Sequence, residues 1–229
     1  MSRHLLLFDI DGTLLHAGGA GRLALSRALR TEFGLGEPAF EELGFAGRTD
    51  RAIASEALRR NGLEPEEPLY QRYLDAYLTH LPKALRERTG QVLPGATDLL
   101  AALAGREDVA LGILTGNIEE AARLKLAHFE LAGFFPGGGR GGFGDHHHDR
   151  DHVARDADLA MREYVAEDAC VWVIGDTPLD VRCARAIGAR AIAVCTGFSS
   201  REELEASKPD HLLDDLRDVA RFLSLLDEG

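Results

Sequence analysis

Four short apolar runs recur along the sequence, and each of them ends in polar or glycine residues. They span residues 5–8, 109–114, 170–174 and 191–195. A run of this length between turn signals is typical of a strand that is buried on both faces of a parallel sheet. Helix-like stretches lie between the runs, at residues 95–104, 118–129 and 178–187. This alternation predicts an α/β fold, in which a doubly wound parallel sheet is covered by helices on both faces.

Residues 17–92 interrupt the alternation, because they contain no convincing buried strand. Their pattern predicts three helices instead, at residues 22–33, 50–60 and 68–81. Gly18, Gly19 and Gly21 open the segment and residues 93–95 (LPG) follow it, so both ends have the composition of a hinge. The sequence therefore predicts an all-helical cap of residues 17–92, inserted into an α/β core made of residues 1–16 and 93–229.

The overall composition is that of a globular protein, with 45% hydrophobic and 28% charged residues. The formal net charge of −12 argues against nucleic acid or an anionic membrane surface as a partner. The first apolar run has only four residues, which is too short for a secretory leader or a membrane span. The three cysteines lie far apart without metal-binding spacing, which favours reduced thiols in a cytoplasmic protein.

Two carboxylates, Asp9 and Asp11, stand at the end of the first apolar run, and Gly12 follows them. In an open α/β sheet, ligands collect at the carboxyl ends of the strands, and Gly12 would turn the chain there. A pair of carboxylates in one crevice suits Mg²⁺, which prefers oxygen ligands. It also suits a division of roles between a nucleophile and a general acid–base. The alternative is an ordinary strand that ends in a solvated acidic turn.

Two later runs end in polar groups as well. After the second run, the hydroxyl of Thr115 and the backbone N–H groups near Gly116 and Asn117 would form a site for phosphate oxygens. The alternative role of these residues is to cap the next helix. After the third run, Asp176 is placed to complete a magnesium site, with Asp180 one helical turn further on. The alternative for this pair is an acidic first turn that the helix dipole favours.

Taken together, three segments resemble the active-site motifs of the haloacid dehalogenase superfamily, in the order in which that family has them. They are residues 9–14 (DIDGTL), 114–117 (LTGN) and 175–180 (GDTPLD). Residues 47–50 (GRTD), in the predicted cap, are similar to a segment that is common in the phosphoglycolate-phosphatase-like branch. The resemblance covers nearly the whole chain, and it implies a Rossmann-like core with a helical cap that closes over the site.

The resemblance also implies catalytic roles for individual residues. Asp9 would attack phosphorus and form an aspartyl phosphate. Asp11 would protonate the leaving alcohol and then activate the water that hydrolyses the intermediate. Thr115 would hold the transferring phosphoryl oxygens. Mg²⁺ would be bound by Asp9, by the main-chain carbonyl of Asp11 and by Asp176, with Asp180 as a supporting or direct ligand.

Further residues are expected to contact the substrate. By the same resemblance, Gly12, Thr13, Gly116 and Asn117 surround the bound phosphate. Arg48, in the predicted cap, would reach the substrate when the cap closes, and a plain surface arginine is the alternative for it.

The chain departs from the family pattern at the cation of the site. Many relatives have a Lys-Pro pair before the helix that precedes the last acidic motif, whereas residues 149–152 are Asp-Arg-Asp-His here. We expect Arg150 to orient Asp9 and the phosphate, as a planar fork rather than a point charge. Lys125 is the alternative, although helix rise alone places it roughly 10 Å from the start of its helix.

A glycine-rich stretch at residues 137–144 predicts a loop with little regular structure. Four histidines lie in or after this stretch, namely His146, His147, His148 and His152. They could bind a soft metal ion, but three adjacent side chains do not easily face one ion. We therefore expect these histidines to belong to a surface loop.

The predicted function is Mg²⁺-dependent hydrolysis of a small phosphorylated metabolite through an aspartyl-phosphate intermediate, in a monomer or a homodimer. A phosphomutase acting on sugar phosphates would use the same residues, and a catalytically silent binding protein on this fold is a further alternative. Asp11 argues against a dehalogenase, because the dehalogenases of the superfamily lack that second aspartate. The sequence does not choose among phosphoglycolate, sugar phosphates, nucleotides and pyrophosphate as the substrate.

Overall fold

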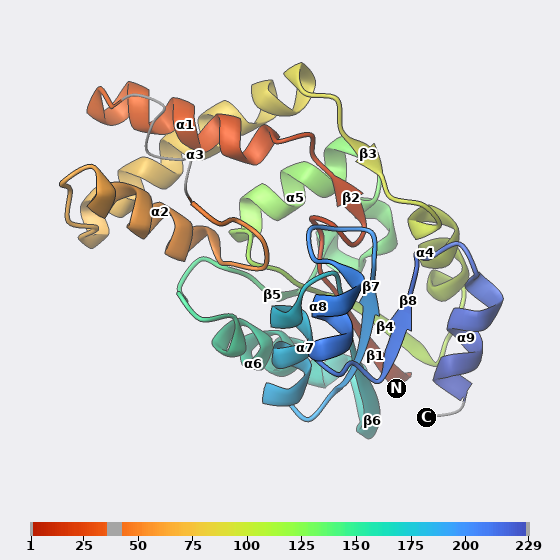
Figure 1. The fold of residues 1–229 in the computed structure, drawn as a ribbon. Coiled ribbons are helices and arrows are strands. Elements are labelled where there is room, and N and C mark those ends of the chain that lie inside the picture. Colours follow the sequence, from red (N-terminus) through yellow and green to blue (C-terminus); the bar gives the residue numbers. More distant parts are fainter. Residues whose placement is uncertain (1, 36–42, 228–229) are drawn as a thin grey trace.

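A six-stranded parallel sheet forms the centre of the molecule in the computed structural model, which describes residues 2–35 and 43–227 (Figure 1). Across the sheet the strands are β5 (Gly141–Gly142), β4 (Val109–Leu114), β1 (Ser2–Phe8), β6 (Val165–Gly175), β7 (Arg190–Val194) and β8 (His211–Leu213). Every neighbouring pair in this order is parallel. The first strand of the chain, β1, therefore lies inside the sheet between β4 and β6.

Helices cover both faces of this sheet. One face is packed by α4 (Ala96–Ala104), α5 (Glu119–His128) and α9 (Val219–Asp227), and the other by α6 (Arg150–Met161), α7 (Pro178–Ala186) and α8 (Arg201–Ala206). Successive side chains of β1 point to opposite faces of the sheet. Leu6 and Phe8 pack in the hydrophobic cluster on the face of α4, α5 and α9, whereas Leu5 and Leu7 pack in the cluster on the face of α6, α7 and α8. The expected doubly wound α/β fold is confirmed, and the apolar runs are strands buried on both faces.

Within the described residues, the core also contains three short 3-10 turns. They are η2 (Ala132–Phe134), η3 (Pro136–Gly138) and η4 (Arg162–Tyr164). Within the described ranges of the chain, no helix is both long enough and apolar enough to span a bilayer.

A separate helical unit stands beyond one end of the sheet, and it is formed by α1 (Ala20–Phe33), α2 (Asp50–Arg60) and α3 (Glu67–Glu87) (Figure 1). The expected end of the third helix at residue 81 was wrong, because α3 continues through Pro82 to Glu87. A proline inside a helix removes one backbone hydrogen bond. Here Leu81, Ala84 and Leu85 are buried on either side of it, so packing of the apolar face carries the helix onward.

The chain enters and leaves this helical unit through a short ribbon. The ribbon pairs β2 (Leu15–His16) with β3 (Gln91–Val92) in antiparallel register. It lies at both boundaries of the predicted division into residues 1–16, 17–92 and 93–229, which stays a prediction. Gly18 and Gly19 lie in the linker with φ of 62° and 80°, whereas Gly21 is already inside α1 and therefore does not belong to the hinge.

The expectation of an irregular loop at residues 137–144 was only partly right, because Gly141–Gly142 forms β5 at the edge of the sheet. A Cβ atom on Gly141 would lie 1.8 Å from the carbonyl oxygen of Ile113, and one on Gly142 would lie 2.1 Å from that of Val153. Only glycine allows the backbone to approach this closely. A strand without side chains leaves no hydrophobic pattern in the sequence, which is why the pattern did not indicate it.

Candidate active site

The carboxyl ends of the central strands meet at a cavity of about 290 Å³ between the sheet and the cap. Asp9 follows β1, and Thr115 follows β4. Both side chains line the cavity, as do Asp11 and Asn117 from the core and Arg48 from the cap. The topology of the sheet thus brings together residues that lie more than a hundred positions apart in the chain.

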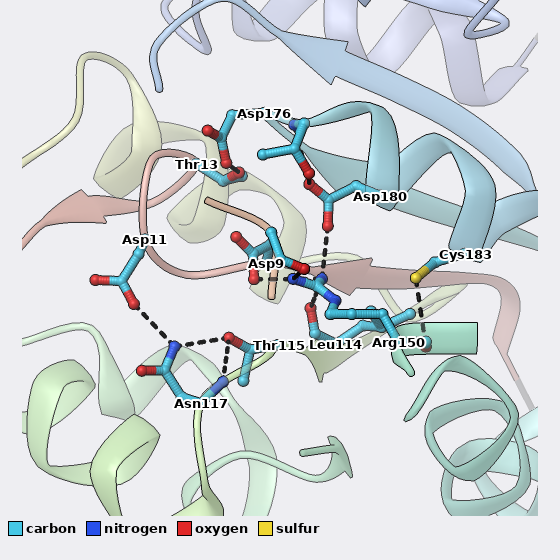
Figure 2. Close-up of polar contacts among 12 residues, drawn as sticks. Asp9, Asp11, Thr13, Leu114, Thr115, Asn117, Arg150, Asp176, Asp180 and Cys183 are labelled. Atoms are coloured by element: carbon cyan, nitrogen blue, oxygen red, sulfur yellow. Dashed lines mark hydrogen bonds and ion pairs between the residues drawn. The ribbon is translucent and has the colours of Figure 1, made fainter. Parts of the chain in front are cut away.

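Three buried carboxylates form a cluster beside this cavity (Figure 2). One carboxylate oxygen each of Asp9, Asp176 and Asp180 lies within 4.8 Å of the other two, and all three residues are at most 5% exposed. Arg150 lies among them, with its Nη2 atom 2.5 Å from Asp180 Oδ1 and 3.5 Å from Asp9 Oδ1. Three carboxylates against one guanidinium leave a negative site made of oxygen donors, which fits a hard divalent cation.

The electrostatics of the cluster follow from its burial. Burial raises the pKa of Asp9 well above its usual range, while the charge of Arg150 opposes this shift. Burial, and after it the repulsion of Asp180, raises the pKa of Asp176 to about 7. Ionisation of Asp9 and Asp176 is therefore unfavourable without a further positive charge, and a bound cation would favour it.

Asp176 is seated by two glycine-containing turns. Its carboxylate accepts hydrogen bonds from Thr13 Oγ1 at 3.3 Å and from the backbone N–H of Phe198 at 3.0 Å. A Cβ atom on Gly12 would lie 2.5 Å from Asp176 Oδ2, and one on Gly197 would lie 1.7 Å from it. Gly12 also has a φ of 95°, which L side chains rarely adopt. Gly12 and Thr13, expected to bind the substrate, thus contact Asp176 here.

Asp180 uses both of its oxygens within the protein. Oδ2 accepts hydrogen bonds from the backbone N–H and the hydroxyl of Thr177, in a capping box at the start of α7. Oδ1 accepts from Arg150. Arg150 also donates to the Leu114 carbonyl at 3.2 Å, so it ties the end of β4 to α7 (Figure 2). Asp180 is therefore placed to hold Arg150 beside Asp9.

A second polar group surrounds Asp11. The ammonium group of Lys125 lies 2.6 Å from Asp11 Oδ2 and 2.6 Å from Asn117 Oδ1. Asn117 donates from Nδ2 to Asp11 Oδ2 and to Thr115 Oγ1, both at 2.8 Å. Helix rise alone was a wrong guide to the reach of Lys125, because the long side chain of a helical residue points back toward the helix N-terminus. Lys125 is buried, and its charge is compensated by Asp11.

The structure therefore brings both candidate cations to the site. Arg150 lies beside Asp9, and Lys125 lies beside Asp11. The sequence posed them as alternatives, but they serve different carboxylates, and both residues line the same cavity.

The predicted cap segment Gly47 to Asp50 is packed onto the loop after β4. The backbone N–H of Asp50 donates to the Gly116 carbonyl at 2.6 Å. A Cβ atom on Gly116 would lie 2.0 Å from the carbonyl oxygen of Arg48, so only glycine allows these two backbone segments to approach this closely. Arg150 donates to the Gly47 carbonyl at 3.4 Å. Cap and core are thus in direct contact at the loop after β4.

The backbone groups expected to be open for phosphate at the start of α5 are engaged by carboxylates. The N–H of Ile118 donates to Asp50 Oδ2 at 3.0 Å, and that of Glu119 donates to Asp145 Oδ2 at 2.9 Å. The positive end of the helix favours such anions, and two nearby acidic side chains supply them. The expectation is therefore corrected for these two N–H groups.

Arg48 lies at the wall of the cavity, where we expected it to meet the substrate. Its guanidinium binds Glu56 at 2.7 Å and the Gly44 carbonyl at 3.1 Å. Both partners belong to the cap, and Glu56 lies in α2, so these two contacts hold the Arg48 side chain against the cap.

The histidines after the glycine-rich stretch are paired individually. His147 contacts Asp156 at 2.8 Å, and His148 contacts Ser55 of α2 at 3.1 Å. In the part of the chain that the structure describes, the only group of three or more candidate metal ligands is Asp9, Asp176 and Asp180. His146, His147 and His148 lie in the loop before α6, as we expected, whereas His152 lies in α6 and the expectation of a loop was wrong for it.

Several residues of the cavity wall were not singled out from the sequence as site residues, among them His16, Asp50, Tyr77 and Phe198. Two of them carried a signal. Asp50 ends the segment that resembles the family's cap, and Phe198 follows the turn after the fourth apolar run. Tyr77 lies in a helical pattern where it is indistinguishable from a core residue, and α3 places it over the core.

Known proteins are similar to this chain over nearly its whole length. The family model of haloacid dehalogenase-like hydrolases matches residues 6–185, and a HAD-hydrolase-like model matches residues 155–219. The phosphoglycolate phosphatase of Synechococcus elongatus is 30% identical over 227 residues, covering 96% of this chain and 97% of that protein.

Solved structures extend the likeness to the fold. The crystal structure of a predicted phosphoglycolate phosphatase from Haemophilus somnus has a TM-score of 0.71 at 16% identity, covering 97% of this chain and 98% of that one. The structure of CbbY from Rhodobacter sphaeroides in complex with phosphate has a TM-score of 0.68 at 22% identity, covering 96% of each chain. The chain belongs to the haloacid dehalogenase-like hydrolases, and it is similar over nearly its full length to the phosphoglycolate phosphatases among them.

Proposed function

We propose that this phosphatase of the haloacid dehalogenase family hydrolyses small-molecule phosphate monoesters with Mg²⁺, through an aspartyl phosphate formed on Asp9. The observation that carries the proposal is the position of Asp9. Its carboxylate is buried at the end of β1, beside Asp176 and Arg150, and it opens into the cavity under the cap. A nucleophile for phosphorus needs such a place, where positive charge offsets its repulsion from the phosphate.

The donor set at this position fits Mg²⁺, since it consists of buried carboxylate oxygens with excess negative charge. In the proposal, Asp9, the main-chain carbonyl of Asp11 and Asp176 hold the ion, and Asp180 supports the site through Arg150. When bound, the ion supplies positive charge that offsets repulsion between the nucleophile and the phosphoryl oxygens.

The residues of the chain divide the chemistry in two steps. In the first, an Asp9 oxygen attacks phosphorus, the bond from phosphorus to the leaving oxygen breaks, and Asp11 gives that oxygen a proton. In the second, Asp11 takes a proton from water, which attacks the phosphorus of the aspartyl phosphate and releases inorganic phosphate. Asp9 and the protonated Asp11 are thereby restored. The hydrogen bonds from Lys125 and Asn117 fix the carboxylate of Asp11 for both transfers.

The phosphoryl oxygens would be held by Thr115 and Arg150. Thr115 is fully buried at the end of β4, and its hydroxyl accepts hydrogen bonds from Asn117. The relative from Synechococcus elongatus is named a phosphoglycolate phosphatase, which makes phosphoglycolate a reasonable first metabolite to test. In the proposal, Arg48 lies on the side of the leaving group, because it lines the cavity from the cap.

A phosphomutase would use the same residues, so product analysis separates it from a phosphatase. A catalytically silent binding protein would bind phosphate without releasing it from an ester. The cytoplasmic location and the choice between monomer and homodimer stay predictions.

The test is phosphate release from an aryl phosphate with and without Mg²⁺, by the wild type and by Asp9→Asn. Release that depends on Mg²⁺ and disappears in Asp9→Asn supports the proposal. Release that survives Asp9→Asn in contaminant-free protein contradicts the nucleophile. No release by the wild type from aryl phosphates, phosphoglycolate or sugar phosphates would favour the binding protein.

A further inference from the structure

We propose that Asp50 is a positioning residue, which clasps the cap to the core and holds the loop after β4 in its reactive arrangement. The kinetic part of this inference rests on the phosphatase function proposed above. Asp50 is the first residue of α2 in the cap, yet its side chain is bound to the start of α5 in the core.

The carboxylate of Asp50 is not needed by its own helix. The N-cap of α2 is Thr49, whose hydroxyl accepts the N–H of Ala52 at 3.1 Å. Asp50 is only 8% exposed, and its Oδ2 accepts the N–H of Ile118. A buried carboxylate requires such a partner, because burial without one is costly. The side chain is therefore committed to the core rather than to the cap.

The backbone of Asp50 makes a second bond to the same loop. Its N–H donates to the Gly116 carbonyl at 2.6 Å, so main chain and side chain together embrace residues 116–118. Gly144 of the core packs equally closely against this loop, because a Cβ atom on Gly144 would lie 2.1 Å from the same Gly116 carbonyl. The loop after β4 is thus held between the cap on one side and Gly144 on the other.

The clasped loop carries the residues that hold Asp11. Asn117 is followed directly by Ile118, the residue that Asp50 binds. Asn117 donates to Asp11 and accepts from Lys125. The charge of Lys125 also opposes the effect of burial on the pKa of Asp50, so it acts on Asp50 as well as on Asp11. Seating of the cap through Asp50 would therefore fix the arrangement of Asn117, Lys125 and Asp11.

Release of the cap has a defined consequence in this arrangement. When the clasp opens, the N–H of Ile118 loses its acceptor, and the charge of Asp50 moves away from Lys125. The core would still bind phosphate, since Arg150 holds Asp9 and Asn117 holds Thr115 through contacts within the core. The reaction would then run only in the clasped state, which would keep bulk water from the intermediate until the leaving group has departed.

The chain offers a matched control in Asp145. Its Oδ2 caps the adjacent N–H of α5, that of Glu119, at 2.9 Å, but Asp145 belongs to the core. Asp145→Ala removes a carboxylate from the same helix end and leaves both hydrogen bonds of the clasp in place. Arg51 donates to the backbone carbonyl of Asp145, and this contact survives the substitution.

We would compare wild type, Asp50→Ala, Asp50→Asn and Asp145→Ala in two measurements on the full chain. The first is kcat/KM for an aryl phosphate in Mg²⁺. We expect a loss of about tenfold to a hundredfold in Asp50→Ala, carried mainly by kcat, as for the loss of a charged hydrogen bond. Asp50→Asn keeps an oxygen for Ile118 and should recover at least half of this loss on a logarithmic scale. Asp145→Ala should stay within about threefold of wild type.

The second measurement is small-angle X-ray scattering in Mg²⁺ and orthovanadate, with thermal unfolding as a check of folding. We expect Asp50→Ala to be folded but more extended than wild type, and Asp145→Ala to match wild type. Equal losses in Asp145→Ala and Asp50→Ala, or a compact and fully active Asp50→Ala, would overturn the inference. If Asp50→Ala does not fold, Asp50→Asn takes its place in the comparison, and a loss of activity no larger than that of Asp145→Ala would overturn the inference. An inactive wild type would contradict the proposed function, and scattering alone would then decide the clasp.

Discussion

The ammonium group of Lys125 lies 2.6 Å from the carboxylate of Asp11, and both side chains face the cavity between core and cap. Arg150 forms the corresponding pair with Asp9. Each of the two carboxylates with a proposed chemical role thus has a cation of its own. The two pairs differ in chemistry. Asp11 is bound by the ammonium group of a flexible lysine, whereas Asp9 lies beside a planar guanidinium, which is held in place by hydrogen bonds to Asp180 and to the Leu114 carbonyl.

Replacing Lys125 by Met should reduce kcat for an aryl phosphate by about a hundredfold, which is at the lower end of what a positioned general acid–base contributes. The reason is that Asp11 and Asn117 would lose the ammonium group that fixes them. Phosphate release at saturating substrate measures the effect. The control is Arg123→Met on the exposed face of the same helix, where Arg123 pairs with Glu119. Equal activity of Lys125→Met and Arg123→Met would refute a role for Lys125.

Replacing Arg150 by Met should destabilise the fold by about 3–5 kcal/mol, because it leaves buried carboxylates without their compensating charge. Arg150 is 3% exposed and contacts both Asp9 and Asp180. Urea unfolding, followed with and without Mg²⁺, measures the change in the free energy of unfolding. We expect Mg²⁺ to restore part of it, since the ion would replace positive charge at the same carboxylates. Arg150→Lys should fall between the two proteins, and an unchanged midpoint in Arg150→Met would speak against this account.

Replacing Gly12 by Ala should lower the affinity for Mg²⁺ much more than replacing Gly19 by Ala. Both residues have a positive φ, of 95° and 80° respectively, so both substitutions strain the backbone by about 1–2 kcal/mol. At Gly12 the new methyl group would collide with Asp176, whereas at Gly19 no atom of the described residues lies within 4 Å of it. The Mg²⁺ concentration for half-maximal activity should rise by at least about tenfold in Gly12→Ala alone, because the displaced carboxylate is a proposed ligand. Equal shifts in both variants would show that backbone strain, rather than the seat of Asp176, sets metal affinity.

The stability of the protein should depend on pH through Asp50. Burial raises the pKa of this carboxyl from 3.8 to about 6, against the attraction of Lys125, with Asp11 and Asp145 also facing it. A carboxyl whose pKa is higher in the folded state stabilises the fold fully below its unfolded pKa. That contribution is lost as the pH rises through about 6.

The measurement is the free energy of unfolding of wild type and Asp50→Asn between about pH 4 and pH 8. The advantage of wild type over Asp50→Asn should shrink by at most about 3 kcal/mol up to about pH 6.5 and stay constant above it. The asparagine does not titrate, so it isolates the carboxyl of residue 50. A difference that stays flat over this window, or that grows with pH, would contradict the position assigned to Asp50.

The parts of the fold that could be predicted from the sequence are those with a strong local pattern. The apolar runs that form β1, β4, β6 and β7 are buried strands, and the polar residues that end them meet at one edge of the sheet because all pairs are parallel. The pattern therefore predicted that Asp9, Thr115 and Asp176 lie at the same edge of the sheet, and the family resemblance implied their roles.

The parts that escaped the sequence depend on contacts over long distances. The two glycines of β5 carry no side-chain pattern, and their pairing depends on a close approach to Ile113. The reach of Lys125 depends on side-chain direction rather than on position in the helix. Asp50 is the first residue of a capped helix, a place where acidic residues are common, and only the packing of cap on core reveals its partner in α5.

The central claim is that phosphate passes through a covalent bond to Asp9. The most direct test mixes the enzyme with substrate and Mg²⁺, quenches in acid within one turnover, and searches the peptide that contains Asp9 by mass spectrometry. We predict a phosphoryl group on Asp9, more of it in Asp11→Asn because water is then not activated, and none in Asp9→Asn. An active wild type that never carries phosphate on Asp9, even when Asp11→Asn slows the second step, would contradict the account.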